Sequence, residues 1–317
     1  MRREVWLLLL LHLSVCCCEL TVSPVTNGKI RIPVKPHDMV PRHLGHLLVN
    51  VEHKFIFCPI EKVASTQYRQ LFQRMAGDEL WFLPPYHVPN RTRLIDMDMK
   101  TVEEILHDDS WTKAVFFRDP AKRLLSAYLH LVASRDSKKF YKILLAKRHL
   151  NSTWTDFWRS ALAPRGIRNI HWDPQISFCG LNKFWPLFNF VGNFEKLSSH
   201  SALLSRRLGI DKYTNSSWAL TRMIQHPLSW RLSKEEKLRR VRNARIPDDY
   251  NKGDCMWCKN HAVHKNDYNT NPVAKYLEFN VWRYIRKSRV YRADYKIMSA
   301  MKTPPFNNTI HEIYALP

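Results

Sequence analysis

The pattern of apolar and polar residues predicts two units of the same kind, each consisting of a strand, a loop and a helix. In the first unit, residues 55–57 are a short apolar run, and apolar residues recur at helical spacing between positions 68 and 75. In the second unit, residues 114–117 form a buried strand and residues 121–132 supply the inner face of a helix. We therefore expect two loops that each leave a strand and open a helix.

The first of these loops has the composition of an anion site. The start of a helix presents unpaired backbone N–H groups and a partial positive charge, and Lys62, Ser65 and Thr66 add side-chain donors. The common nucleoside-triphosphate loop needs glycines for close approach of the backbone, and no glycine occurs between Gly45 and Gly77. The sequence thus predicts a phosphate site for a ligand other than ATP.

The second loop, Arg118-Asp119-Pro120, resembles the first in its chemistry. Proline suits the first turn of a helix, where its missing N–H costs nothing. Arg118 stands at the end of the strand, and Lys122 and Ser126 are four residues apart and share a helix face. Two such tips suit a ligand that carries two separated phosphates.

Four stretches, in order, resemble one family, the Golgi carbohydrate sulfotransferases of the chondroitin, dermatan, GalNAc 4-O and HNK-1 branch. They are EKVASTQYRQLF at residues 61–72, RDPAKRLLSAY at 118–128, HWDPQISFC at 171–179 and FNFVGNFEKL at 188–197. The first resembles the family's 5′-phosphosulfate loop and the second its 3′-phosphate element. The resemblance runs from about residue 54 to the YRADY stretch at residues 291–295.

This resemblance implies a PAPS-dependent sulfotransferase fold, an α/β fold with a P-loop-like central parallel sheet flanked by helices. The donor in the family is 3′-phosphoadenylyl sulfate (PAPS). Lys62 would be the catalytic cation, Ser65 and Thr66 would bind the 5′-phosphate, and Arg118 and Ser126 would hold the 3′-phosphate. The full expected donor site is Lys62, Val63, Ala64, Ser65, Thr66, Gln67, Arg118, Arg123 and Ser126.

The acceptor is expected to be a hydroxyl group of a glycan, GalNAc in a glycosaminoglycan or at the end of an N-glycan. A hydroxyl needs a base within hydrogen-bond reach, and a neutral imidazole suits the mildly acidic Golgi. His171 is the first candidate, followed by Glu195 and His264. The first interpretation of Glu195 is an ion pair or a helix N-terminal carboxylate. The expected catalytic residues are therefore Lys62 and His171, and no metal is required.

Two departures from the family pattern lead to an alternative. Glu61 stands where most loops of the family have proline, and a carboxylate beside a phosphate is unfavourable unless it points away or pairs with a cation such as Arg69. Asn182 stands where the family usually has a second cysteine, so the family's disulfide pattern does not carry over directly and the chain resembles a divergent member. Glu61 is the feature that leaves an alternative, a catalytically inactive, secreted glycosaminoglycan-binding protein on the same fold. A nucleoside or sugar kinase would need the missing glycines.

Composition limits the number of domains and the kinds of partner that the protein can have. The 317 residues are 45% hydrophobic, enough for one sizeable core, and 50 Lys plus Arg against 28 Asp plus Glu give a formal charge of +22. Such a charge implies a polyanionic partner: nucleic acid, anionic lipid or acidic glycan. Charge alone does not choose among them.

The first twenty residues indicate the compartment. Arg2 and Arg3 precede an apolar run at residues 5–18, which is the layout of a secretory signal. We expect residues 1–20 to be a signal peptide or a type II anchor in the Golgi membrane, residues 21–45 a short stem and residues 46–317 a lumenal catalytic domain. Secretion is the alternative. A lumenal or secreted domain does not meet nuclear or cytosolic nucleic acid, so no nucleic-acid partner is expected.

The cysteines and glycosylation sequons fit an oxidising lumen. Sequons begin at four asparagines, and four cysteines lie outside the targeting segment, which allows three pairings into two disulfides. Cys255 and Cys258 precede His261 and His264 at three-residue intervals, which raises the question of zinc. A zinc finger needs about a dozen residues between its cysteine and histidine pairs, so a disulfide role is simpler. The sequons begin at Asn90, Asn151, Asn215 and Asn307, and the cysteines are Cys58, Cys179, Cys255 and Cys258.

Further elements follow from the same patterns. Helices are expected at residues 101–107, 152–162, 197–208, 233–245 and 272–287, the third of them ending at Gly209. Ser233 and Glu236 have capping-box spacing. A third strand with a turn is expected within residues 183–195.

Overall fold

The computed structural model describes residues 41–82, 93–133, 145–146, 151–215, 218, 233, 235–236, 239, 256 and 276–300. These residues belong to one unit, Pro33–Pro317. Three expected features lie outside the described residues: the targeting segment, most of the stem, and the motif of Cys255, Cys258, His261 and His264. No described helix combines the length and the apolar character needed to cross a bilayer.

The centre of the fold is a four-stranded mixed sheet. Its strands, in spatial order, are β1 (Leu48–Asn50), β2 (Phe55–Cys58), β3 (Thr112–Phe117) and β4 (Phe190–Asn193). β1 runs antiparallel to β2, whereas β2, β3 and β4 are parallel. Ala114 on β3 pairs with Phe57 on one side and with Phe190 on the other. The sheet confirms the expected α/β class, and its antiparallel edge β1 adds a strand that the sequence pattern did not predict.

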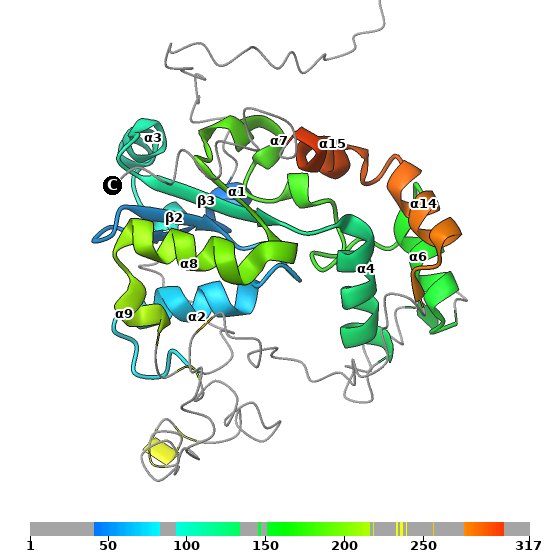
Figure 1. The fold of residues 1–317 in the computed structure, drawn as a ribbon, viewed down its shortest axis with the longest axis horizontal. Coiled ribbons are helices and arrows are strands. Elements are labelled where there is room, and N and C mark those ends of the chain that lie inside the picture. The colour runs from blue at the N-terminus through cyan, green and yellow to red at the C-terminus, as the bar shows by residue number, and fades with distance from the viewer. Residues whose placement is uncertain are drawn as a thin grey trace, which may run out of the picture. The chain divides into compact units, whose positions relative to one another are not determined.

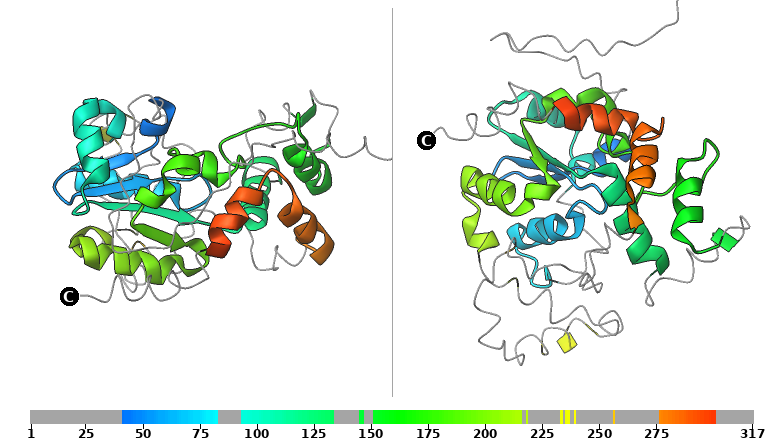
Figure 2. Two further views of the ribbon diagram at one scale, coloured as in Figure 1. Left: turned by 90° about the horizontal axis from the view of Figure 1, so that it is seen from above. Right: turned by 45° about the vertical axis from the view of Figure 1, so that its right-hand side comes forward.

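Helices cover both faces of the sheet. Figures 1 and 2 show α2 and α8 on one side of the sheet and α3 on the other. The α-helices are α1 (Pro41–Leu44), α2 (Ser65–Met75), α3 (Met99–His107), α4 (Pro120–Tyr128), α6 (Trp154–Leu162), α7 (Leu181–Phe184), α8 (Leu197–Leu208), α9 (Asp211–Thr214), α14 (Phe279–Lys287) and α15 (Arg292–Ala300). Shorter turns are η3 (Leu94–Asp96), η5 (Gln175–Ser177), η6 (Trp185–Leu187), η7 (Phe194–Lys196) and the π-helical η4 (Leu129–Ala133).

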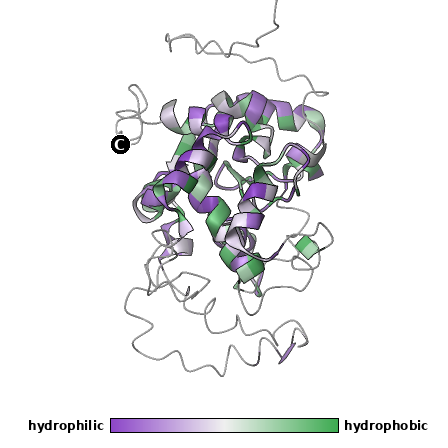
Figure 3. Cartoon of the chain, turned by 90° about the vertical axis from the view of Figure 1, so that its right-hand side faces the viewer, coloured by the Kyte–Doolittle hydropathy of each residue, from purple (hydrophilic) through white to green (hydrophobic). Residues whose placement is uncertain are grey.

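The ends of the helices follow from their sequences. Asp98 and Thr153 accept hydrogen bonds from backbone N–H groups in the first turns of α3 and α6. Asp119 does the same for α4, where Pro120 occupies the first position. Gly209 takes a left-handed φ of 63° and ends α8, as expected. Figure 3 shows both green and purple residues along the helices, as amphipathic packing requires.

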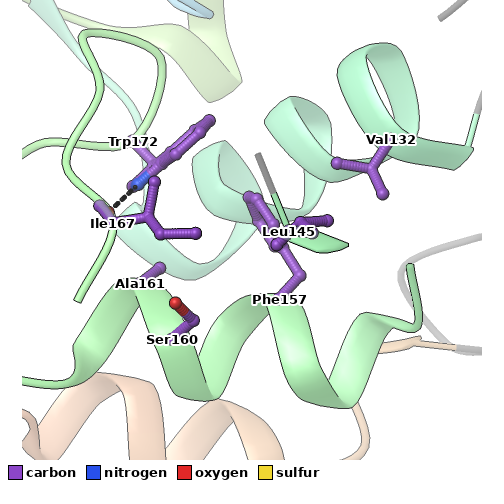
Figure 4. A pocket seen from close by; sticks show the side chains of 7 residues that line it. All are labelled: Val132, Leu145, Phe157, Ser160, Ala161, Ile167 and Trp172. Atoms are coloured by element: carbon purple, nitrogen blue, oxygen red, sulfur yellow. Dashed lines mark hydrogen bonds between the residues drawn. The ribbon is translucent and has the colours of Figure 1, made fainter. Parts of the chain in front are cut away.

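Two apolar clusters stabilise the fold. The larger one surrounds the sheet, where Phe57 stacks on Tyr68 of α2 with ring centroids 3.7 Å apart. The smaller one joins α4, α6 and α14, which lie side by side in Figure 1. A cavity of about 10 Å³ lies within the smaller cluster, room for about one water molecule. Its lining is shown in Figure 4 and consists of Val132, Leu145, Phe157, Ser160, Ala161, Ile167 and Trp172.

Two elements differ from the sequence pattern. The third strand covers only Phe190–Asn193, because the preceding residues form the helical turns α7 and η6. The helix after β3 changes at Leu129 from an α-helix into the π-helical turn η4.

Ser233 Oγ accepts the backbone N–H of Glu236 at 3.1 Å, which agrees with the expected capping box.

Candidate functional site

The three parallel strands end at the same edge of the sheet, and the loops that follow them form the candidate site. Ligands of open α/β sheets bind at this edge. The loop after β2 holds Lys62, the turn after β3 holds Arg118, and the 3₁₀ turn η7 after β4 holds Glu195. The topology thus brings together the two tips that the sequence predicted.

The loop between β2 and α2 makes a tight turn without glycine. The N–H of Val63 donates to the carbonyl of Ile60 at 3.0 Å, and Lys62 and Ala64 take left-handed φ values of 69° and 59°. A left-handed conformation costs a residue with a Cβ about 1–2 kcal/mol. Ala64 is the N-cap residue of α2 and has no side chain that could cap the helix. The first turn of α2 therefore keeps the character of an anion site.

Two hydrogen bonds hold the carboxylate of Glu61 beside this helix start. Its carboxylate accepts from Arg69 at 2.5 Å and from the Ser65 hydroxyl at 2.8 Å. Burial opposes ionisation of Glu61, but the Arg69 guanidinium and the Ser65 hydroxyl outweigh burial and lower its pKa to about 2. The pairing with Arg69 that the sequence required is present. The hydroxyl of Ser65 points to Glu61.

Lys62 is a desolvated cation. Burial lowers the pKa of its ammonium to about 7, and the nearby Arg118 and Arg123 act in the same direction, against the opposing charge of Glu61. Its Nζ lies 2.5 Å from Nδ1 of His130, which belongs to the π-helical turn η4. An anion that binds beside a lysine in this state stabilises its charged form.

Arg118 joins the two tips. Its guanidinium donates to the carbonyl of Lys62 at 3.0 Å and lies over the ring of Phe194, 4.4 Å from the centroid. Its backbone N–H donates to Oε1 of Gln175 at 2.9 Å. The guanidinium is therefore fixed between the first loop and η7.

Arg123 links two loops of the site through hydrogen bonds to their backbone carbonyls. It is 1% exposed, and its three guanidinium nitrogens donate to the carbonyls of Glu61, Ile170 and Asp173 at 2.8, 2.9 and 2.6 Å. One side chain thus ties the loop after β2 to the loop that carries His171. This geometry gives Arg123 a positioning part in the expected donor site.

The remaining donor-site candidates lie in the loop before α2 and on the helices α2 and α4. Val63 is buried, Thr66 and Gln67 are half-buried in the first turn of α2, and Ser126 is half-buried on α4. Ser126 is one turn after Lys122 and one turn before His130. All three therefore lie on one face of the α4–η4 segment.

His171 lies beside the same site. Burial lowers the pKa of its imidazole to about 4, and the charge of Lys62 adds to this effect. Arg123 donates to the carbonyls of Ile170 and Asp173, which flank His171, and also to the carbonyl of Glu61 next to Lys62. Glu195 forms an ion pair with Lys122 at 3.0 Å, in agreement with the first interpretation of this carboxylate.

Three residues at the site were missed by sequence reasoning: His130, Gln175 and Asp294. His130 continues the four-residue spacing of Lys122 and Ser126, and this periodicity could have revealed it. Gln175 and Asp294 lie in the quoted stretches HWDPQISFC and YRADY, but their role depends on contacts with distant segments, which no local pattern shows.

A disulfide joins two of the four candidate cysteines. Cys58 at the end of β2 is bonded to Cys179, with Cα atoms 6.1 Å apart. The sequence left this pairing open. The bond fixes the start of the Lys62 loop to the chain segment that follows His171. Within the described ranges, no group of three or more His, Cys, Asp or Glu side chains could hold a metal ion.

The comparisons with known proteins agree with this geometry. The model of the sulfotransferase family matches residues 45–252, which is more than half of the chain, so the chain belongs to the sulfotransferase family. This match includes both loops, Arg123 and His171. No solved structure matches the chain.

Curated relatives are carbohydrate sulfotransferases. Carbohydrate sulfotransferase 11 of Rattus norvegicus is 26% identical over 200 residues, which cover 55% of this chain and 56% of the relative. Carbohydrate sulfotransferase 14 of Danio rerio is 26% identical over 185 residues, 54% of this chain and 50% of the relative. Carbohydrate sulfotransferase 8 of Homo sapiens is 24% identical over 193 residues, with 54% and 44% covered. The chain spans about half the length of these relatives.

Proposed function

We propose that the protein transfers a sulfuryl group from PAPS to a hydroxyl of a glycan. One observation carries this proposal: the guanidinium of Arg118 donates to the carbonyl of Lys62, so two cations from two strand ends lie at one site. A donor with a 5′-phosphosulfate and a 3′-phosphate requires two cationic positions. Family membership and the carbohydrate sulfotransferase names of the relatives support the same reaction.

The donor would lie across the two tips. The N–H groups at the start of α2, that of Ser65 among them, would bind the 5′-phosphate together with Thr66 and Gln67, while the Ser65 hydroxyl donates to Glu61. Lys62 would approach the oxygen that bridges sulfur and phosphorus. Arg118 would contact the 3′-phosphate through its planar fork, with Ser126 beside it. Val63 and Ala64 shape the turn, and Arg123 holds it in place through the carbonyl of Glu61.

The reaction is an in-line displacement, for which the protein supplies positioning and charge. The acceptor oxygen forms a bond to sulfur, and the bond between sulfur and the bridging phosphate oxygen breaks. Negative charge accumulates on that bridging oxygen, where Lys62 stabilises it. The acceptor proton passes to a base, and 3′,5′-adenosine bisphosphate leaves.

His171 is the proposed base. A pKa of about 4 keeps its imidazole neutral at the mildly acidic pH of the Golgi, so it can accept a proton. Arg123 donates to the carbonyls of Ile170 and Asp173 on either side of His171 and to that of Glu61 before Lys62, which supports this choice. Glu195 is paired with Lys122, which leaves His171 as the better candidate.

An acidic glycan is the proposed acceptor, with GalNAc in a glycosaminoglycan or at the end of an N-glycan as first choice. The formal charge of +22 favours an acceptor that already carries negative charge. The proposed location is the Golgi membrane, with the N-terminal segment as a type II anchor and the catalytic domain in the lumen. The N-terminal charge and apolar pattern support it.

Nucleotide binding tests the donor site. The purified domain should bind 3′,5′-adenosine bisphosphate at least tenfold more tightly than 5′-AMP or ATP in calorimetric titrations. Arg118→Ala should remove this preference, whereas Arg206→Ala, at an exposed position late in α8, should not. Transfer of radiolabelled sulfate from PAPS to desulfated glycans then tests the reaction. If the domain binds no nucleotide, the proposed enzyme function is wrong.

The same titration separates the alternative of an inactive glycosaminoglycan-binding protein. Glu61 was the feature that favoured this alternative, and its carboxylate is bound to Arg69 and Ser65. Such a protein would bind heparin-like chains without any preference for the 3′-phosphorylated nucleotide.

A further inference from the structure

The Lys62 ammonium lies against the imidazole of His130. The two nitrogens, Nζ and Nδ1, are 2.5 Å apart, although the residues are 68 positions apart in the sequence. Lys62 belongs to the loop after β2, and His130 belongs to η4, beyond the end of α4. In its charged form the Lys62 amine can only donate, so Nδ1 then accepts and the ring proton is on Nε2.

The charges around Lys62 explain why its partner is a neutral ring. The carboxylate of Glu61, its neighbour in the chain, is already bound to Arg69 and Ser65. Arg118 and Arg123 are close enough to disfavour the charged form of Lys62. A carboxylate in the place of His130 would hold Lys62 in a strong ion pair. An imidazole nitrogen holds it by a weaker, uncharged acceptor.

We propose that His130 is a positioning residue that holds Lys62 in a resting position, and that a phosphate group of the donor replaces His130 as the partner of Lys62. This inference rests on the proposed function. Phosphate carries negative charge and imidazole does not, so phosphate adds a Coulomb attraction to the Lys62 ammonium and the exchange is favourable. The resting bond orders the flexible lysine before the donor arrives.

The π-helical turn is the feature that places His130. The chain changes from α4 to η4 at Leu129, one residue before His130. Single π-helical turns inside helices occur frequently at functional sites. His130 follows Ser126, the proposed 3′-phosphate ligand, by four residues. One helix face therefore carries a proposed donor ligand and the resting partner of the catalytic lysine.

A double-mutant cycle tests the proposal. The affinity for 3′,5′-adenosine bisphosphate is measured for His130→Ala and His130→Asn, each with Lys62 and with Lys62→Met. His130→Ala should bind the bisphosphate about two- to tenfold more tightly than the wild type does. In this variant, binding no longer breaks the hydrogen bond between Lys62 and His130, and the fold-change corresponds to the net contribution of one hydrogen bond. His130→Asn, which keeps a neutral acceptor, should restore most of the wild-type affinity. In the Lys62→Met background, His130→Ala should change the affinity for the bisphosphate by less than twofold.

The cycle distinguishes positioning from a structural role. If His130→Ala changes the affinity by the same factor with Lys62 and with Lys62→Met, the proposal is overturned, because the effect would not pass through Lys62. An unchanged affinity in the His130→Ala variant overturns it as well. His107→Ala, in the last turn of α3, serves as the matched control and should bind like the wild type.

A second measurement does not depend on nucleotide. In spectra of protein with ¹⁵N-labelled histidine, His130 should show the Nε2–H tautomer, and Lys62→Met should shift its Nδ1 resonance. If this shift is absent, the resting hydrogen bond does not exist. If the shift is present but the wild type binds no bisphosphate, the proposed function fails and the exchange with phosphate fails with it.

Discussion

The side-chain amide of Gln175 forms two hydrogen bonds with the backbone of Arg118. Its Oε1 accepts the Arg118 N–H at 2.9 Å, and its Nε2 donates to the Arg118 carbonyl at 2.8 Å. Gln175 is fully buried, and its own N–H donates to Oδ2 of Asp294 on α15 at 2.8 Å. The C-terminal helix thus reaches the end of β3 through one side chain.

Removal of the Gln175 amide should weaken recognition of the 3′-phosphate. In Gln175→Ala, two backbone groups of Arg118 lose their partners, which costs about 1–3 kcal/mol per buried group and loosens the turn. We expect affinity for 3′,5′-adenosine bisphosphate to fall about tenfold and affinity for 5′-AMP to change little. Ser177→Ala, at an exposed position in the same 3₁₀ turn, is the control. Equal losses for both nucleotides would contradict this role.

Catalysis should have two pH limits. The value of kcat/KM should fall as pH rises above about 7, because the Lys62 ammonium loses its proton there, and should fall below about pH 4, because His171 becomes protonated. Lys62→Arg should move the upper limit to higher pH, since guanidinium keeps its charge. His171→Ala should lower kcat by about 10²–10⁴-fold and leave bisphosphate affinity unchanged. An upper limit that stays in place in Lys62→Arg would rule out this assignment.

The ion pair of Glu61 should contribute to stability in a pH-dependent way. The pKa of Glu61 is about 2 in the folded protein and 4.5 ordinarily, so its contribution is complete above about pH 4.5 and is lost as pH falls toward 2. Glu61→Gln should lower the free energy of unfolding at pH 7 by about 1–3 kcal/mol. The difference in Tm from the wild type should shrink steadily below pH 4.5. Glu104→Gln, which breaks an exposed pair with Lys100, should leave Tm unchanged.

The disulfide should be needed for full stability. It joins residues 121 positions apart, and closing a loop of this size stabilises a fold by about 2–5 kcal/mol. Urea unfolding of a Cys58→Ala, Cys179→Ala double variant should show a loss of that size. Mass spectrometry of a non-reduced digest should recover one peptide pair that contains Cys58 and Cys179. A digest that joins Cys58 to a different cysteine would contradict the pairing.

The sequence predicted the elements whose signals are local. The apolar run at residues 55–57 and the helical spacing after it gave β2 and α2, and the same pattern gave β3 and α4. Gly209 marked the end of α8. The turn chemistry indicated a phosphate site, and the four ordered stretches indicated a sulfotransferase through their resemblance to that family.

The tertiary structure decided which distant side chains meet. It paired Cys58 with Cys179, bound Glu61 to Arg69 and placed His130 against Lys62. It also gave different contacts to the two arginines of the RDPAKRLLSAY stretch, Arg118 and Arg123. Arg118 joins the tips of the site, whereas Arg123 is buried against three carbonyls.

The physical reason lies in the range of the interactions. Periodicity, capping and turn preferences act over a few residues, so the chain by itself determined the two strand–loop–helix units and the cations and hydroxyls at their tips. Hydrogen bonds and ion pairs between segments depend on packing, because burial removes water and leaves each polar group to find a partner in the protein. Folding therefore decided which side chains surround Lys62 and Arg118.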